Sequence, residues 1–404
     1  MQLAKVKELE QKYVLGTYAR FDVLFERGSG AYLIDASNKR YLDLLAGIAV
    51  NALGYNHPRI KQVLRKQIKR PLHLSNLFYH EYQGRLAEKL CTLSGLDRAF
   101  FTNSGAESIE GCLKFARAYA SKAAEANGGS RKFRFLAMDN AFHGRTFGAL
   151  SATAHAKYRQ PFEPLVPGFD FVQANNIEDL EKKFTPDVCG VLIETLQGEG
   201  GIRPVTEEFY RAARRLTQQN GALLIADEIQ CGLGRTGDWF AFHKWIDPSD
   251  KENLPDMIAL AKPLGLGIPM GAVILKEHVA NAIKPGDHGT TFGGGPLACR
   301  VSLEYFKVIE DDKLLDHIRE TGAYFKNRLE ELKDLPIVKE VRGAGFMLAV
   351  ELTVPGKEYV KQLLERGFII NCTHETVLRF LPPFVLTSKQ IDKFVKALRA
   401  VLTA

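Results

Sequence analysis

Residues 222–230 read Ala-Leu-Leu-Ile-Ala-Asp-Glu-Ile-Gln, and this stretch decides the predicted fold class. Its first five residues are all apolar, which is typical of a strand that is buried on both faces. The strand then ends in a carboxylate, Asp227. Strands of this kind occur in mainly parallel sheets that are covered by helices, so the stretch predicts an α/β protein.

The same pattern recurs along the chain. Further apolar runs occupy residues 98–102, 133–138, 190–194, 257–261 and 271–275. Helical patterns alternate with these runs, and a long one begins at Ala106 and stops at Asn127-Gly128-Gly129. The alternation predicts a large domain with a mainly parallel central sheet.

The two ends of the chain show other patterns. Residues 2–13 have a helical pattern, and two strand-like pieces flank Gly28-Ser29-Gly30 as in a hairpin. From Pro296 onward, a helical stretch over 297–332 precedes strand patterns at 338–342 and 345–350 and a terminal helix from Ser388. We predict three parts: an N-terminal segment (1–45) that packs with the small domain, a large cofactor-binding domain (46–295) and a small C-terminal α+β domain (296–404).

Composition narrows the class of protein. The 404 residues are 46% hydrophobic and 25% charged, as in an ordinary globular protein, and the net charge is +7. This mild basicity suits anionic substrates or a phosphate cofactor. The sequence has no concentrated basic arm of the kind that binds nucleic acid. No apolar stretch is long enough to span a bilayer. The six cysteines form no CxxC pair, and no His stands at metal-ligand spacing, so we expect free thiols, a cytoplasmic protein and no metal.

Polar residues follow several of the predicted strands directly. They are Asn103, Glu194, Asp227 and Lys262. Open α/β sheets bind ligands at the carboxyl ends of their strands, so we expect these side chains to meet at one edge.

Ser104-Gly105-Ala106 leads from one of these strands into the long helix. Free backbone N–H groups and the positive end of the helix dipole would face a phosphate there. The alternative interpretation is that Ser104 simply caps the helix.

A lysine and an acid complete a recognisable chemistry. Lys262 follows an apolar strand, where loss of solvation would lower the pKa of its amine and allow attack on an aldehyde to form a Schiff base. Asp227 is suited to pair with a protonated pyridine nitrogen. Phe142 is a candidate to stack on the ring, unless it is a core residue, and Gln230 to donate to the ring's phenolic oxygen. Together with the phosphate cradle, these groups are what pyridoxal phosphate requires.

Five arginines stand in Gly- or Pro-containing contexts and are candidates to clamp substrate carboxylates, with structural salt bridges as the alternative. They are Arg145, Arg203, Arg235, Arg342 and Arg379.

In these motifs the chain resembles the class III (subgroup II) aminotransferases of pyridoxal-phosphate fold type I, and most closely the acetylornithine aminotransferases. The resemblance runs almost end to end. It rests on the motifs Thr17-Tyr18-Ala19-Arg20, Leu45–Asn51, Asn103–Glu107, Phe142–Thr146, Gln197–Gly201, Asp227–Gln230, Gly234–Gly237 and His288–Gly294. Ser108-Ile109, Pro263 and Gly295 depart from the usual family pattern, and none of these departures removes a catalytic group.

The resemblance implies a role for each matching residue. Lys262 corresponds to the Schiff-base lysine and Asp227 to the partner of the pyridine nitrogen. Gly105 and Ala106 correspond to the phosphate-binding backbone. Phe142 corresponds to the aromatic residue that stacks on the ring, and Thr291 to a threonine that contacts the phosphate of the other subunit in a homodimer. Arg145 and Arg379 correspond to arginines that bind substrate carboxylates. Glu199 corresponds to a glutamate that pairs with Arg379 and releases it when a dicarboxylate binds. Tyr18 and Thr290 complete the predicted substrate-binding set.

The family also sets the alternatives for the reaction. Ornithine aminotransferases carry a Tyr in the stretch that matches Gly47-Ile48, whereas this chain reads Ala46-Gly-Ile-Ala49. We therefore expect transfer of the δ-amino group of N2-acetylornithine to 2-oxoglutarate, as in arginine biosynthesis. Ornithine, succinylornithine and 4-aminobutyrate aminotransferases remain alternatives, and so does a catalytically silent cofactor-binding homologue.

Overall fold

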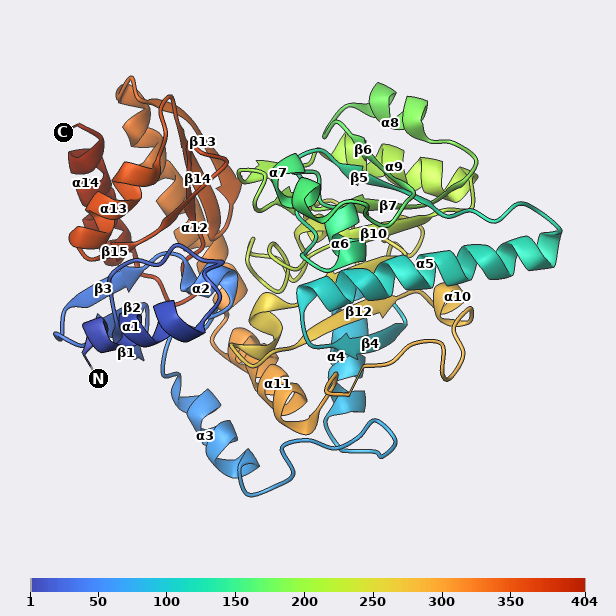
Figure 1. Cartoon of the computed structure of the whole chain (residues 1–404), viewed down its shortest axis with the longest axis horizontal. Coiled ribbons are helices and arrows are strands. Elements are labelled where there is room, and N and C mark those ends of the chain that lie inside the picture. The colour runs from blue at the N-terminus through green and yellow to red at the C-terminus, as the bar shows by residue number, and fades with distance from the viewer. Residues whose placement is uncertain (1, 404) are drawn as a thin grey trace.

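A central sheet organises the structure, which is a computed structural model that describes residues 2–403. Its strands are β4 (Arg98–Thr102), β5 (Arg134–Met138), β6 (Phe169–Val172), β7 (Val188–Ile193), β10 (Leu223–Asp227), β11 (Met257–Leu260) and β12 (Gly271–Leu275). The seven strands lie in the order β4-β12-β11-β10-β7-β5-β6 (Figure 1). All neighbours pair in parallel except at β12, which is antiparallel to both β11 and β4. The predicted α/β fold with a mainly parallel sheet is confirmed.

One strand of this sheet, β6, was not predicted from the sequence. It lies at the edge, beside β5 alone, and its first three residues are only half buried. The sequence Phe169-Asp-Phe-Val172 therefore lacks the continuous apolar run that identified the central strands.

Helices cover both faces of the sheet. They include α4 (Gln83–Ser94), α5 (Gly105–Asn127), α8 (Ile177–Lys183) and α9 (Glu207–Gln219). Strand β10 shows how the two faces are divided: Ile225 packs in the cluster that contains α5 residues, whereas Leu224 packs in the cluster that contains α4 and α9 residues. Since neighbouring side chains of a strand point to opposite faces, a continuous apolar run is needed here.

The N-terminal segment forms a small sheet of its own. After α1 (Leu3–Tyr13), the strands β1 (Phe25–Ser29) and β2 (Tyr32–Asp35) form the predicted hairpin, and β3 (Arg40–Asp43) follows. Strand β15 (Phe368–Ile369) pairs in parallel with β3. Backbone hydrogen bonds therefore join the N-terminal segment to the C-terminal part of the chain.

The C-terminal part contains a four-stranded antiparallel sheet covered by helices. Its strands are β13 (Val338–Ala344), β14 (Met347–Leu352), β16 (Asn371–Thr373) and β17 (Val377–Phe380), and its helices are α11 (Pro296–Asp311), α12 (Leu314–Glu330), α13 (Lys357–Glu365) and α14 (Ser388–Leu402). The predicted helical stretch 297–332 is two helices, because Lys313 has a φ of +50°, outside the right-handed helical region. The terminal helix begins at Ser388 as predicted, behind a Thr387 capping box.

Further helices and strands lie between or beside these layers. They are α2 (Ala46–Ala49), α3 (Pro58–Gln67), α6 (Phe147–Ser151), α7 (Ala156–Arg159), α10 (Glu277–Ala280), β8 (Leu196–Gln197) and β9 (Arg203–Pro204). Within residues 2–403, no helix combines the length and the apolar character that a membrane crossing requires.

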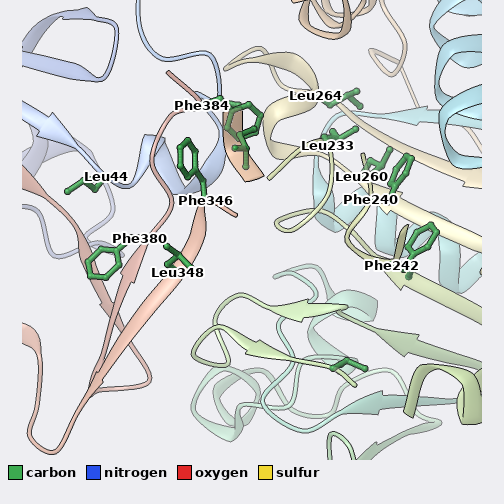
Figure 2. Close-up of a cluster of buried hydrophobic side chains, with 14 of the residues drawn as sticks. Leu44, Leu233, Phe240, Phe242, Leu260, Leu264, Phe346, Leu348, Phe380 and Phe384 are labelled. Carbon is green, nitrogen blue, oxygen red and sulfur yellow. The ribbon is translucent and has the colours of Figure 1, made fainter. Parts of the chain in front are cut away.

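One buried cluster joins the two large parts of the chain. Figure 2 shows Leu233, Phe240, Leu260 and Leu264 on one side and Phe346, Leu348, Phe380 and Phe384 on the other. All of these side chains are almost completely inaccessible to solvent. Because the cluster is continuous, the side chains on β17 are held in a fixed position relative to the ends of the central strands.

Candidate active site

A cavity of about 400 Å³ opens at the carboxyl edge of the central sheet. Its walls include the start of α5, the segment after β5, and the ends of β7, β10 and β11. The cavity brings together most of the residues that the sequence singled out: Asn103, Ser104, Gly105, Ala106, Phe142, Arg145, Glu194, Glu199, Asp227, Gln230 and Lys262.

The start of α5 forms one wall. Ser104 does cap this helix, since its Oγ accepts the N–H of Glu107 at 3.2 Å. Gly105 and Ala106 nevertheless line the cavity, and the first N–H groups of a helix have no acceptor within it. Capping and anion binding are therefore compatible here.

A glycine allows the next segment to approach this helix. A Cβ on Gly144 would lie 2.9 Å from the Cβ of Ala106, and the φ of Gly144 is +143°. Any side chain at position 144 would push the Phe142–Arg145 segment away from the start of α5.

Asp227 has a partner that was not predicted from the sequence, His143. The Nδ1 of His143 lies 2.7 Å from Oδ2 of Asp227, and both side chains are buried. Burial alone would lower the pKa of His143, but the hydrogen bond and the charge of Asp227 outweigh it and raise the pKa. The other carboxylate oxygen accepts the N–H of Ile229 at 3.0 Å. No sequence pattern relates positions 143 and 227, since only the fold brings them together.

Lys262 lines the cavity and is partly buried. Burial lowers the pKa of its amine, although Glu199 and Asp227 act in the opposite direction. Its φ of +35° is unusual for a residue with a side chain, and strain of this kind is found at functional sites. A buried amine with a lowered pKa is suited to nucleophilic attack.

Glu194 connects two walls of the cavity. Its Oε1 accepts the N–H of Phe142 at 2.9 Å, and its Oε2 accepts the N–H of Gly198 at 3.0 Å. Burial raises the pKa of this carboxyl to about 7, and the hydrogen bonds together with His143 limit the rise. The sequence identified Glu194 as a polar strand end, but nothing in it indicated these two contacts.

Arg379 and Glu199 form an ion pair beside the cavity. The Nη1 of Arg379 lies 2.5 Å from Oε1 of Glu199, and Arg379 is completely buried. Burial would raise the pKa of Glu199, but Arg379 outweighs this effect and lowers it. Arg379 also donates to Oε1 of Gln230 at 3.2 Å, which leaves the amide NH₂ of Gln230 as a donor for other groups.

Arg145 lies at an exposed position of the cavity wall. Its guanidinium carbon is 3.9 Å from the centre of the Tyr158 ring and 5.5 Å from that of Phe142. The other three candidate arginines make structural contacts instead: Arg342 pairs with Glu351 at 2.5 Å, Arg203 approaches the same carboxylate at 3.5 Å, and Arg235 donates to the carbonyls of Phe346 and Pro382.

Four predicted site residues do not line the cavity: Arg379, which lies beside it in the ion pair with Glu199, and Thr290, Thr291 and Tyr18. Thr290 lies next to the cavity, where its Oγ1 accepts from Nδ2 of Asn103 at 2.8 Å. Thr291 is exposed on the same loop, and Tyr18 is 77% exposed in the N-terminal segment. The cavity of a single chain therefore does not bring Tyr18 or Thr291 to the other site residues.

The residues of the cavity fit a phosphorylated pyridine aldehyde. The start of α5 offers free N–H groups to a phosphate, Asp227 offers a buried carboxylate to a pyridinium, and Lys262 offers an amine to the aldehyde. The Nδ1 of His143 contacts the Asp227 carboxylate, and the Nε2 of His143 has no partner among the described residues. Fold and site together define a pyridoxal-phosphate enzyme of fold type I.

Comparison with known proteins gives the family. The family model "Aminotransferase class-III" matches residues 16–402, and the chain belongs to this family. It is a pyridoxal-phosphate-dependent transaminase.

Individual relatives are similar over nearly their whole length. The chain is 47% identical over 398 residues to the acetylornithine aminotransferase of Methanocaldococcus jannaschii, covering 98% of this chain and 97% of the relative. It is 43% identical over 392 residues to the acetylornithine aminotransferase of Aquifex aeolicus, covering 96% and 100%. Among solved structures, the ornithine aminotransferase of Toxoplasma gondii has a TM-score of 0.92 at 31% identity, covering 100% of this chain and 95% of that one.

Proposed function

We propose that this enzyme transfers the δ-amino group of N2-acetylornithine to 2-oxoglutarate. The observation that carries the proposal is the Glu199–Arg379 ion pair beside a cavity whose wall also holds Arg145. Pyridoxal phosphate supplies the electron sink for this chemistry when it is bound. The chain's own residues must then admit a donor with one carboxylate and an acceptor with two.

Arg145 is the arginine that is free to bind the donor. Its guanidinium makes ring contacts but no ion pair among the described residues, whereas Arg379 is neutralised by Glu199. A monocarboxylate donor is therefore directed to Arg145, and its amino end can point toward Lys262.

Arg379 is the arginine reserved for the acceptor. When the Glu199 side chain turns away, Arg379 can bind the α-carboxylate of 2-oxoglutarate bidentately, while Arg145 binds the distal one. Gln230 and Asn371 both contact Arg379, so the guanidinium stays in place when Glu199 leaves.

The preference for an acylated donor is supported by the segment Ala46–Ala49. Gly47 and Ile48 take left-handed conformations, and the segment carries apolar side chains where ornithine aminotransferases carry a Tyr. A free α-ammonium group would find no hydrogen-bond acceptor on these side chains. The similarity to curated acetylornithine aminotransferases agrees with this preference. Free ornithine is the second candidate donor, because the fold also matches an ornithine aminotransferase with a TM-score of 0.92.

We further propose a homodimer with shared active sites. Leu77, Phe78 and Tyr79 expose large apolar side chains, and Phe292, next to Thr291, does so on the adjoining loop. Asn76 joins the two loops by donating to the carbonyls of Thr290 and Gly293 at 3.1 and 3.0 Å. An isologous dimer that covers this apolar surface would bring each Thr291 to the phosphate end of its partner's cavity.

We also propose that the enzyme is located in the cytoplasm. All six cysteines are free thiols, as expected in a reducing compartment.

The proposal is tested by following the two half-reactions separately. The enzyme should convert N2-acetylornithine to its semialdehyde without a keto acid, and should then form glutamate when 2-oxoglutarate is added. Glu199→Ala should slow the first step more than the second, because an unpaired Arg379 would attract the donor carboxylate and misplace the δ-amine. No amino transfer from any donor would favour the silent homologue.

A further inference from the structure

Strand β16 runs along the Glu199–Arg379 ion pair and contacts both of its members. Asn371 and Arg379 are direct partners in the antiparallel register of β16 and β17. The Oδ1 of Asn371 accepts from Nε of Arg379 at 3.1 Å. Two residues further on, the hydroxyl of Thr373 donates to the main-chain carbonyl of Glu199 at 2.7 Å. Alternate residues of a strand share a face, so one edge strand reaches both partners.

The shorter contact of Thr373 is to the main chain of Glu199, and the same hydroxyl also lies 3.5 Å from Oε2 of the Glu199 carboxylate. Thr373 is almost fully buried, and Arg342 adds a second anchor by donating to the carbonyl of Gly201 at 2.8 Å. The backbone of the 199–201 loop is thus fixed to the C-terminal sheet. The carboxylate of Glu199 can leave Arg379 by side-chain rotation alone, without movement of the loop.

The contact with Arg379 fixes the orientation of the guanidinium. Asn371 occupies the Nε side, and Gln230 and Glu199 share Nη1. A neutral amide at position 371 orients Arg379 without neutralising it, which is why only Glu199 decides whether Arg379 is available to an anion.

We propose that Asn371 and Thr373 are positioning residues of the ion pair that selects between monocarboxylate and dicarboxylate ligands. Thr373 holds the main chain of Glu199 so that its carboxylate rests on Arg379, and Asn371 holds Arg379 ready for the ligand once that carboxylate leaves. This inference rests on the proposed function, since it assigns the ion pair the same role.

Substitutions at positions 371 and 373 should have opposite effects on the affinity for a dicarboxylate. Thr373→Val removes the hydroxyl with little change of shape, so the Glu199 carboxylate should rest less firmly on Arg379 and a dicarboxylate should displace it more easily. Asn371→Asp adds a second carboxylate against Arg379, so the guanidinium should stay neutralised and a dicarboxylate should bind less well.

The test is equilibrium binding of unreactive acids to the holoenzyme, measured by calorimetry. The probes are glutarate, with two carboxylates, and pentanoate, with one. Relative to wild type, the Kd of glutarate should fall about threefold in Thr373→Val and rise about tenfold in Asn371→Asp, while that of pentanoate changes less than twofold in Asn371→Asp. In turnover, Thr373→Val should slow the donor half-reaction more than the acceptor half-reaction, and Asn371→Asp should slow the acceptor half-reaction more than the donor half-reaction.

Thr217→Val is the matched control. Thr217 is a buried threonine of α9 whose hydroxyl also donates to a main-chain carbonyl, that of Arg214, at 2.8 Å. The Thr217→Val variant should lose about as much folding stability as Thr373→Val and keep the wild-type Kd values for glutarate and pentanoate. Equal shifts in Thr217→Val and Thr373→Val, or shifts of the same sign at positions 371 and 373, would overturn the proposal.

The outcome also separates this inference from the proposed function. If wild-type enzyme binds glutarate and pentanoate equally well, the ion pair does not select between ligands and both proposals fail. If wild type discriminates but the variants do not diverge, the positioning roles alone are wrong. Should Thr373→Val fail to fold, Asn371→Asp still decides the question.

Discussion

The imidazole of His143 lies 2.7 Å from the carboxylate of Asp227, and the pair is buried at the base of the cavity. The raised pKa of His143 favours the imidazolium form, which stabilises the ionised carboxylate. An ionised Asp227 is what a protonated pyridine nitrogen requires as its partner. His143 is therefore a positioning residue for Asp227.

The first prediction concerns the pH dependence of this pair. The pKa of His143 is higher in the folded than in the unfolded protein, so the pair stabilises the fold fully below pH 6.5 and progressively less as pH rises through the folded-state value. Thermal unfolding should show a larger loss of Tm on His143→Gln at pH 6 than at pH 9.

His243 provides the control for this measurement. Burial lowers the pKa of His243 to about 4, so this residue destabilises the folded protein as pH falls below 6.5. His243→Gln should therefore gain stability relative to wild type at pH 5 and not at pH 8. A loss of Tm for His143→Gln that does not vary with pH would mean that His143 is neutral in the folded protein.

The second prediction concerns Lys262. Lys262→Ala should reduce transamination by more than about a thousandfold and leave the fold intact, because no other lysine within residues 2–403 lines the cavity. Borohydride reduction followed by mass spectrometry should find the cofactor attached at position 262 in wild type. Lys276→Ala is the control: its amine also has a pKa lowered by burial, but it pairs with Asp256 away from the cavity. Full turnover by Lys262→Ala would exclude this lysine from the chemistry.

The third prediction concerns Asp227. Asp227→Asn keeps the shape but removes the charge that pairs with the pyridine nitrogen, so the donor half-reaction should slow by about a hundredfold or more. Rapid-mixing spectroscopy of that half-reaction measures the effect. A near-normal rate would show that the ring nitrogen is held in another way.

The fourth prediction concerns Gly144. A methyl group there would lie 2.9 Å from the Cβ of Ala106, so Gly144→Ala should push the Phe142 segment off the start of α5 and weaken cofactor binding by at least about tenfold. Fluorescence titration of the apoenzyme with pyridoxal phosphate measures the affinity. Gly84→Ala is the control, because a Cβ on this helical glycine meets no atom within 4 Å and should slightly stabilise α4. Equal affinities in the two variants would contradict the packing argument.

Chemistry and local pattern made much of this site predictable from sequence. Lys262, Asp227 and the start of α5 follow strands whose apolar runs are unmistakable, and the sheet brings their ends together. His143 was not predictable, because its partner is far away in the sequence and the contact depends on packing. Strand β17, which carries Arg379, was missed for a related reason: Val377–Phe380 is short and its buried arginine interrupts the apolar run.

The central claim is the choice of donor, and it is tested most directly by kcat/KM with 2-oxoglutarate as acceptor. N2-acetylornithine should exceed both free ornithine and 4-aminobutyrate by at least about tenfold, which corresponds to about 1.4 kcal/mol of transition-state binding. A tenfold preference for either unacylated amine would contradict the substrate assignment and leave the assignment as an aminotransferase intact.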